Sequence, residues 1–158
     1  MPNNIANNLI SVNNSIKNAA MNVERNPADV SLVVVSKTQP AKSIQLVIGR
    51  GYSVFGENKV QEAEEKWPDL KSAYPESTLH LIGPLQSNKT KRAVQLFDVI
   101  ETVDRIKIAK ALAREMDAQN IYPECYIQVN TGEEPQKTGV LPTDVDAFIK
   151  QCCVELKL

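Results

Sequence analysis

The chain has 158 residues, of which 42% are hydrophobic and 23% are charged, and its formal net charge is −1. This length suits one ordinary domain, residues 1–158, with a substantial core. The nearly balanced charge gives no basic surface for nucleic acid or for an anionic membrane. No apolar run approaches the roughly 20 residues that cross a bilayer, and residues 1–8 lack the pattern of a secretory signal. We therefore expect a cytoplasmic protein.

The cysteine and histidine content excludes several kinds of site. The three cysteines, Cys125, Cys152 and Cys153, are odd in number and have no C-x-x-C spacing. This pattern argues against a disulfide framework and against a structural zinc site. His80 is the only histidine, so metal sites built from several histidines are excluded. No G-x-S-x-G motif is present, which argues against a hydrolase built on a Ser-His-Asp triad.

The chain begins with an expected helix and then alternates between strands and helices. Apolar residues recur at steps of three or four over residues 5–23, which is typical of an amphipathic helix. Beyond it, continuous apolar runs predict buried strands, and stripes of helical period predict the helices between them. The expected strands cover 31–36, 52–55, 78–82, 97–102 and 124–129, and a sixth begins at 154–158. The expected helices cover 40–50, 58–67, 87–95, a segment after Asp104, and 142–153.

Two boundaries of the helix expected at 58–67 rest on single residues. Asn58 stands where the helix begins and is a good N-cap residue, because its side chain can accept a hydrogen bond from the first helical turn. Pro68 lacks a backbone donor and clashes with the preceding turn, so it predicts the end of the helix.

The regular alternation predicts an α/β fold with a parallel sheet, and two architectures fit it. A strand recurs about every 25 residues, as expected for strands joined by crossover helices. A (β/α)8 barrel of the TIM type needs roughly 250 residues, so this chain would hold an N-terminal helix, about five βα units and the start of strand six. A complete five-stranded sheet of the flavodoxin type fits the length better. The motifs favour the incomplete barrel.

Lys37 is the most informative single residue. It follows three consecutive valines at the predicted carboxyl end of the first strand, which is the end where parallel α/β proteins bind ligands. A lysine in that position can lose its proton and form a Schiff base with a carbonyl compound, above all pyridoxal phosphate. The alternative interpretation is a solvated loop lysine.

Polar residues also follow the other predicted strands. Asn58 comes after the second strand, where it serves either as a helix cap or as a ligand contact. His80 alternates with Leu79 and Leu81 and should face the opposite side of its strand. Asn130 follows the fifth strand, where a turn role is equally good.

In combination, five segments resemble the pyridoxal phosphate homeostasis protein family, which is itself similar to the N-terminal barrel domain of alanine racemase. The segments are Val-Ser-Lys-Thr (35–38), Phe-Gly-Glu-Asn-Lys-Val-Gln-Glu (55–62), His-Leu-Ile-Gly-Pro-Leu-Gln-Ser-Asn-Lys (80–89), Glu-Thr-Val-Asp-Arg (101–105) and Gln-Val-Asn-Thr-Gly-Glu-Glu-Pro-Gln-Lys-Thr-Gly (128–139). They occur in the family's order and together span nearly the whole chain.

The resemblance implies a cofactor and four residues that contact it. The fold would be a modified TIM barrel that binds pyridoxal 5′-phosphate, with Lys37 carrying the Schiff base. Asn58, His80 and Ile82 would lie on neighbouring strand ends close to the cofactor. The family is thought to bind and buffer pyridoxal phosphate and has no established catalytic turnover. Its full-length members are expected to be monomers, and the last third of its sequence would supply the phosphate cup.

Three further expectations complete the hypothesis. An open sheet edge would invite self-association. One alternative function is a racemase-like enzyme that uses the same lysine, but racemisation on this fold needs a second acid/base from a separate β-domain, for which this sequence shows no elements. The other alternative is a cofactor-free interaction module of the flavodoxin type.

Overall fold

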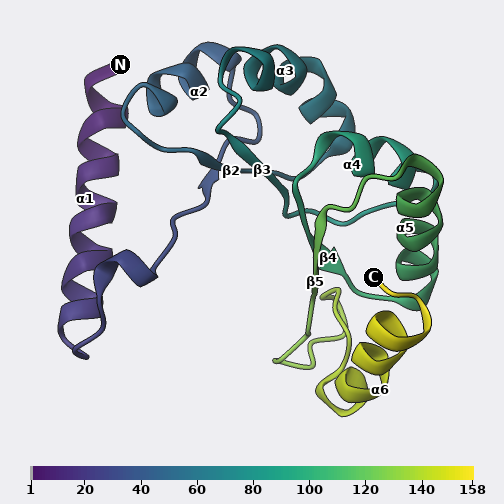
Figure 1. Ribbon diagram of the computed structural model, residues 1–158. Coiled ribbons are helices and arrows are strands. Elements are labelled where there is room, and N and C mark those ends of the chain that lie inside the picture. Colours follow the sequence, from purple (N-terminus) through teal and green to yellow (C-terminus); the bar gives the residue numbers. More distant parts are fainter. Residues whose placement is uncertain (1) are drawn as a thin grey trace.

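The computed structural model of the protein describes residues 2–158, with side chains from residue 4 onward. Helix α1, Pro2–Met21, forms the N-terminal part of the molecule (Figure 1). Ile5 and Leu9 on this helix pack against the core. Ile10 and Val12 are exposed, because only part of the apolar stripe is covered. The amphipathic helix predicted over 5–23 is confirmed.

Five parallel strands form one sheet in the described part of the chain, and their spatial order follows the chain order. The strands are β1 (Val34–Val35), β2 (Val54–Glu57), β3 (Thr78–Leu81), β4 (Val99–Val103) and β5 (Glu124–Ile127). A flavodoxin-type sheet would have the order 2-1-3-4-5, so that alternative is wrong. Strands added in chain order are typical of a (β/α) barrel, and the sheet stays open at β1 and β5. The predicted incomplete barrel is confirmed.

The helices between the strands arch over one face of the sheet (Figure 1), here called the outer face. They are α2 (Ala41–Ile48), α3 (Val60–Ala73), α4 (Thr90–Leu96) and α5 (Ile106–Gln119). The core lies between these helices and the strand side chains that point outward. Its largest fully buried members include Trp67, Phe55, Leu79, Leu81, Ile100 and Leu112. The other face, here called the inner face, corresponds to the interior of a closed barrel.

The predicted end of helix α3 at Pro68 is wrong, because the helix continues to Ala73 with Pro68 inside it. An internal proline costs a helix about 3 kcal/mol. Trp67 and Leu70 on either side are fully buried in the core, whereas Pro68 is exposed. The packing of the buried side chains offsets the lost hydrogen bond, and the proline ring lies on the solvent side.

The sixth strand predicted at 154–158 is also wrong. Helix α6, Val145–Lys150, leads instead into a π-helical turn, Gln151–Glu155. The reason is the helical spacing of Phe148, Cys152 and Leu156, which recur every four residues and all pack against the core. The same apolar residues that resemble the start of a strand therefore extend the stripe of a helix.

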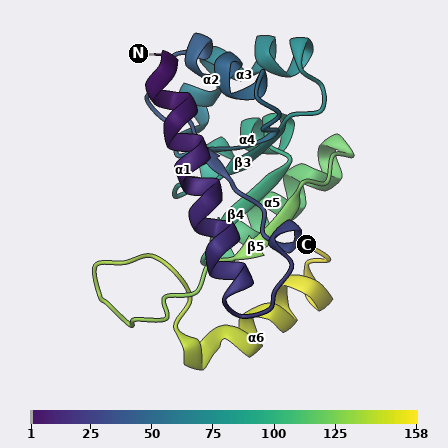
Figure 2. The same cartoon turned by 90° about the vertical axis from the view of Figure 1, so that its left-hand side faces the viewer.

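Strand β1 is shorter than the predicted 31–36 because it forms one edge of the sheet. Its pairing with β2 covers Val34 and Val35, and a further bond from the Ser36 N–H to the Gly56 carbonyl, at 2.9 Å, continues it. At the other edge, the exposed loop that follows β5 projects from the body of the molecule (Figure 2). No helix in the described residues is long and apolar enough to cross a membrane.

Candidate functional site

The carboxyl ends of β1, β2 and β3 lie side by side and bring three of the predicted residues to the carboxyl end of the sheet. Lys37 directly follows Ser36, whose N–H donates to the Gly56 carbonyl. Asn58 directly follows Glu57, whose carbonyl accepts a 2.9 Å hydrogen bond from the N–H of Ile82. Because both bonds continue the parallel ladder, Lys37, Asn58 and Ile82 emerge from adjacent strands at the same level.

Two glycines allow this close approach of the strand ends. A Cβ on Gly56 would lie 3.0 Å from the Ile82 side chain and 3.1 Å from that of Val33. A Cβ on Gly83 would lie 2.2 Å from the backbone oxygen of Asn58. A side chain at either position would push the neighbouring segment away. Gly56 therefore lets the Ile82 side chain lie against β2, and Gly83 lets the chain after β3 lie against the backbone of Asn58.

His80 faces the inner side of the sheet, as its alternation with Leu79 and Leu81 predicts. Both leucines are fully buried under the helices, whereas the His80 side chain is 12% exposed. Its Nδ1 lies 2.6 Å from Oε1 of Glu101 on β4. A carboxylate at Nδ1 favours a proton on that nitrogen and leaves Nε2 directed away from the pair. His80 lies two residues before Ile82 and pairs in register with Gly56, so it lies near the same carboxyl end of the sheet.

Sequence reasoning missed Glu101. The available signal was the single charged residue of β4, at a position that alternates with the buried Ile100. Tyr126 on β5 was also missed. Its hydroxyl donates to Glu124, and that carboxylate, together with the more distant Glu101, raises the pKa of the phenol. Glu101 and Tyr126 therefore extend the polar inner face beyond His80.

Lys37 itself is exposed and lies in a turn over residues 36–39, of which the first residue, Ser36, is buried. The next residue, Thr38, has a positive φ of 62°, which is unfavourable for a β-branched side chain. Helix α3 holds this turn. The Thr38 N–H donates to the carboxylate of Glu62, and the Lys66 ammonium donates to the Ser36 and Gln39 carbonyls at 2.9 and 3.2 Å. The turn that carries Lys37 is thus held by side chains from another element.

The interpretation of Asn58 as a helix cap is wrong. The N-cap of α3 is Lys59, and no side chain forms a capping hydrogen bond there. Asn58 is half-buried between the ends of β2 and β3. By contrast, Asn130 has the predicted turn role, because its side-chain amide donates to the Glu134 carbonyl at 2.9 Å.

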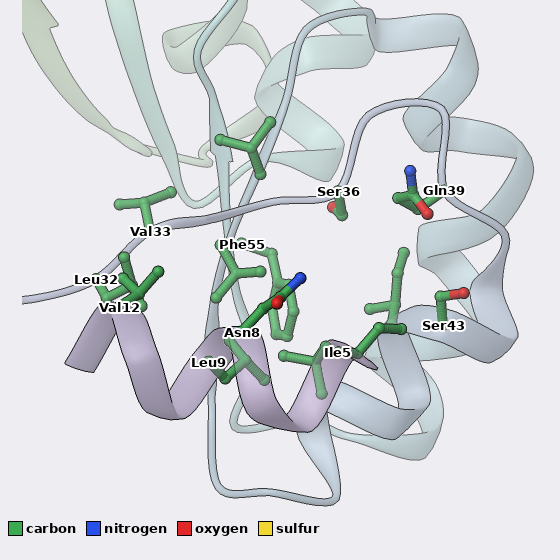
Figure 3. A pocket seen from close by; sticks show the side chains of 14 residues that line it. Ile5, Asn8, Leu9, Val12, Leu32, Val33, Ser36, Gln39, Ser43 and Phe55 are labelled. Atoms are coloured by element: carbon green, nitrogen blue, oxygen red, sulfur yellow. The ribbon is translucent and has the colours of Figure 1, made fainter. Parts of the chain in front are cut away.

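A largely apolar pocket of about 400 Å³ lies between α1, β1 and α2, and Ser36 and Gln39 of the turn that carries Lys37 are among its lining residues. Figure 3 shows Leu9 and Val12 of α1 on one side and Val33 and Phe55 near the first two strands on the other. None of the four predicted cofactor residues lines this pocket. Its described lining residues include no lysine or arginine that could pair with a phosphate group. In the described residues, no group of three or more His, Cys, Asp or Glu side chains could hold a metal ion.

Comparison with known proteins identifies the family. The profile of the family described as "Alanine racemase, N-terminal domain" matches residues 10–157. The chain belongs to the alanine racemase N-terminal domain family. The curated relatives that it resembles are called pyridoxal phosphate homeostasis proteins. That of Haemophilus influenzae is 37% identical over 147 residues, which cover 93% of this chain and 62% of the relative. That of Pseudomonas aeruginosa is 38% identical over 144 residues, covering 91% and 62%.

Several solved structures have a similar fold. PipY of Synechococcus elongatus, solved without PLP, has a TM-score of 0.75 at 37% identity and covers 87% of this chain and 63% of its own. The structure of PipY with PLP bound has a TM-score of 0.74 at 35% identity, covering 88% and 64%. A protein of unknown function from Bifidobacterium adolescentis reaches 0.92 at 27% identity, covering 97% and 65%. The chain thus spans less than two thirds of the length of each relative compared.

Proposed function

We propose that this chain binds pyridoxal 5′-phosphate as a Schiff base on Lys37 and contributes to homeostasis of that cofactor without catalytic turnover. Residues 1–158 would act as one cofactor-binding domain, of which Lys37, Asn58, His80 and Ile82 contact the ligand. The observation that carries the proposal is the position of Lys37. Its amine follows the carboxyl end of β1, beside the ends of β2 and β3.

The residues at this end of the sheet fit the aldehyde and the ring of the cofactor. A primary amine is the group that condenses with an aldehyde. The half-buried Ile82 side chain, which covers Gly56 together with Val33, offers an apolar surface for a flat ring. His80, oriented by Glu101 at 2.6 Å, supplies a polar group on the same face. When bound, pyridoxal phosphate supplies an electron-withdrawing ring that stabilises negative charge on attached groups.

The phosphate group of the cofactor needs backbone N–H donors or cationic side chains. By the family resemblance, these donors would come from the part of the longer relatives that this chain does not span; it covers 62% of the Haemophilus influenzae relative. Pyridoxal and pyridoxal phosphate should therefore label Lys37 of this chain with similar affinity. A strong preference for the phosphorylated form would place a phosphate site within residues 1–158 and would extend the proposal.

The experiment that tests the proposal is reductive trapping. The 158-residue protein is incubated with pyridoxal phosphate, reduced with borohydride and mapped by mass spectrometry. We expect the adduct on Lys37, and its loss in Lys37→Ala together with loss of visible absorbance. Lys42→Ala, which removes an exposed lysine of α2, is the matched control and should label normally. An adduct on another lysine, or none, would overturn the proposal.

A racemase assay with L-alanine and pyridoxal phosphate separates this function from the enzymatic alternative. We expect no D-alanine above the rate of free cofactor, because the proposal gives the chain no second acid/base on the opposite side of the ring. Sustained turnover that disappears in Lys37→Ala would instead support the racemase-like alternative. The cytoplasmic location expected from the sequence stays a prediction.

A further inference from the structure

A buried polar network lies under the turn that carries Lys37, on the outer face of the sheet rather than on the face proposed for the cofactor. Its central residue is Glu57, which is fully buried at the end of β2. Oε1 of Glu57 accepts hydrogen bonds from Ser36 Oγ at 2.6 Å and from Trp67 Nε1 at 3.2 Å. The ammonium of Lys66 lies 2.9 Å from the same oxygen. Three groups, one from the turn after β1 and two from α3, thus meet at one carboxylate oxygen.

Lys66 connects this buried carboxylate to the turn. Its ammonium, on a side chain that is 10% exposed, lies 2.9 Å from Glu57 and 2.9 Å from Glu62. The same ammonium donates to the carbonyls of Ser36 and Gln39, the first and last residues of the turn. An ammonium has three N–H donors, so four acceptors around it use its full capacity.

Glu62 completes the hold on the turn by accepting a hydrogen bond from the N–H of Thr38. Backbone groups of three turn residues are therefore bonded to side chains of α3. In the hydrogen bonds and ion pairs of the described residues, the side chain of Lys37 takes no part. The turn is held at its backbone, while the amine between the fixed points is left for another partner.

The energetics of this arrangement point beyond stability alone. A buried ion pair contributes little net stability, because desolvation of both charges offsets their attraction. The turn also contains Thr38 in the left-handed region, a conformation that costs of order 1–3 kcal/mol and persists when the surroundings impose it. A buried ion pair that holds the backbone in an unfavourable turn is expected where the position of the neighbouring side chain, here Lys37, matters for function.

We infer that Glu57, Glu62 and Lys66 are positioning residues that pre-organise the turn of Lys37 for capture of the cofactor aldehyde. The inference rests on the proposed function. In this view, residues on the outer face of the sheet hold the turn in the conformation that presents the Lys37 amine to the cofactor. Loss of the ammonium would free the turn, so that Lys37 would spend less time in the reactive geometry. A displacement of about 1 Å can slow such a reaction by about 100-fold.

The test compares Lys66→Met with Lys71→Met. Both variants remove an ammonium from α3 that is paired with a carboxylate, but Lys71 pairs with Asp98 at 2.6 Å and forms no bond to the turn. For each protein, the rate of adduct formation on Lys37 is measured with pyridoxal phosphate and borohydride, and amide hydrogen exchange is followed at Thr38. We expect Lys66→Met to slow the labelling of Lys37 at least about tenfold and to speed exchange at Thr38. Lys71→Met should change neither.

A second pair of variants keeps the inference testable if Lys66→Met does not fold. Glu62→Gln removes the charge that accepts from Thr38 while leaving Lys66 its buried partner, and it should slow labelling less than Lys66→Met. Glu57→Gln keeps an oxygen acceptor, and its new amide nitrogen would occupy the position of Oε2, which has no partner among the described residues. Glu57→Gln should therefore keep most of the wild-type labelling rate, whereas Glu57→Ala should lose more of it.

The outcomes separate the two proposals. If the wild-type chain forms no adduct on Lys37, the proposed function fails and this inference fails with it. If the wild type labels Lys37 and Lys66→Met labels it equally fast, the proposed function stands and the positioning role is overturned. The free energy of unfolding should fall more in Lys66→Met, which leaves the buried Glu57 without its cation, than in Lys71→Met, whose pair is partly exposed. Labelling rates are therefore compared under conditions in which both variants are folded, and a slower rate in Lys66→Met alone would then report on geometry.

Discussion

The two faces of the sheet surround their carboxylates differently. On the outer face, Glu57 is fully buried and one of its oxygens meets Ser36, Trp67 and Lys66. On the inner face, the Glu101 side chain is 31% exposed and pairs with His80. The first carboxylate belongs to the packed core and holds backbone in place. The second remains accessible and orients a ring that a ligand could meet. One layer of strands thus separates a fully buried carboxylate from a partly exposed one.

The largest effect that should break this comparison comes from the outer face. Trp67→Ala removes a fully buried ring, its tilted packing on Phe55 at 5.2 Å, and a hydrogen bond to Glu57. We expect the free energy of unfolding to fall by about 3–5 kcal/mol, measured by urea denaturation. Val35→Ala, at a strand position that is 47% exposed, should change it by no more than about 0.5 kcal/mol. Equal losses in both variants would refute the assignment of the core to the outer face.

A smaller effect is expected from the inner face. Glu101→Ala removes the partner of His80 and should lower the free energy of unfolding by less than about 1 kcal/mol, because the pair is partly exposed. It should nevertheless change the tautomer of the His80 ring. His80 is the only histidine, so a single set of imidazole nitrogen resonances reports its tautomer. We expect a dominant Nδ1–H form in the wild type and a mixture in the variant. An unchanged spectrum would mean that Glu101 does not orient His80.

The smallest effect concerns the pH dependence of stability. The hydrogen bond from Lys66, and to a lesser extent that from Thr38, hold the pKa of Glu62 below its ordinary value of 4.5. A carboxyl whose pKa is lowered in the folded state binds fewer protons there than in the unfolded chain, so it stabilises the fold above pH 4.5. That contribution is lost as the pH falls through the lowered pKa. Urea denaturation between pH 6 and pH 3 should show a shallower loss in Glu62→Gln than in the wild type. Identical slopes would remove Glu62 from the hold on the turn.

Much of the fold could be predicted because it depends on local patterns. Continuous apolar runs predicted each of the five observed strands, and apolar stripes of helical period predicted α1 to α6. The failures come from residues whose local signal was overruled by packing. Pro68 did not end α3, because Trp67 and Leu70 bury the same helix. Residues 154–158 did not form a strand, because Leu156 continues the stripe of Phe148 and Cys152.

The candidate site divides in the same way. Lys37, Asn58, His80 and Ile82 follow or lie within predicted strands, and the parallel order of those strands is enough to predict that they share one end of the sheet. Glu101 also lies within a predicted strand, but its pairing with His80 and the bonds of Lys66 to the turn have no local signal. Glu101 is 21 residues from His80, and Lys66 is 30 residues from Ser36. Their partners are decided by which strands become neighbours and by which turn of α3 lies over the end of β1.

Sequence by itself thus determined the parallel α/β order of this protein and the place of Lys37 after a strand end. Both follow from period and turn chemistry, which act over a few residues. Only the tertiary structure decided which carboxylate is buried and which stays open, and which ammonium holds the turn of Lys37. Those outcomes depend on solvent exclusion and on contacts between distant segments, since burial is a property of the packed chain and not of any stretch of it.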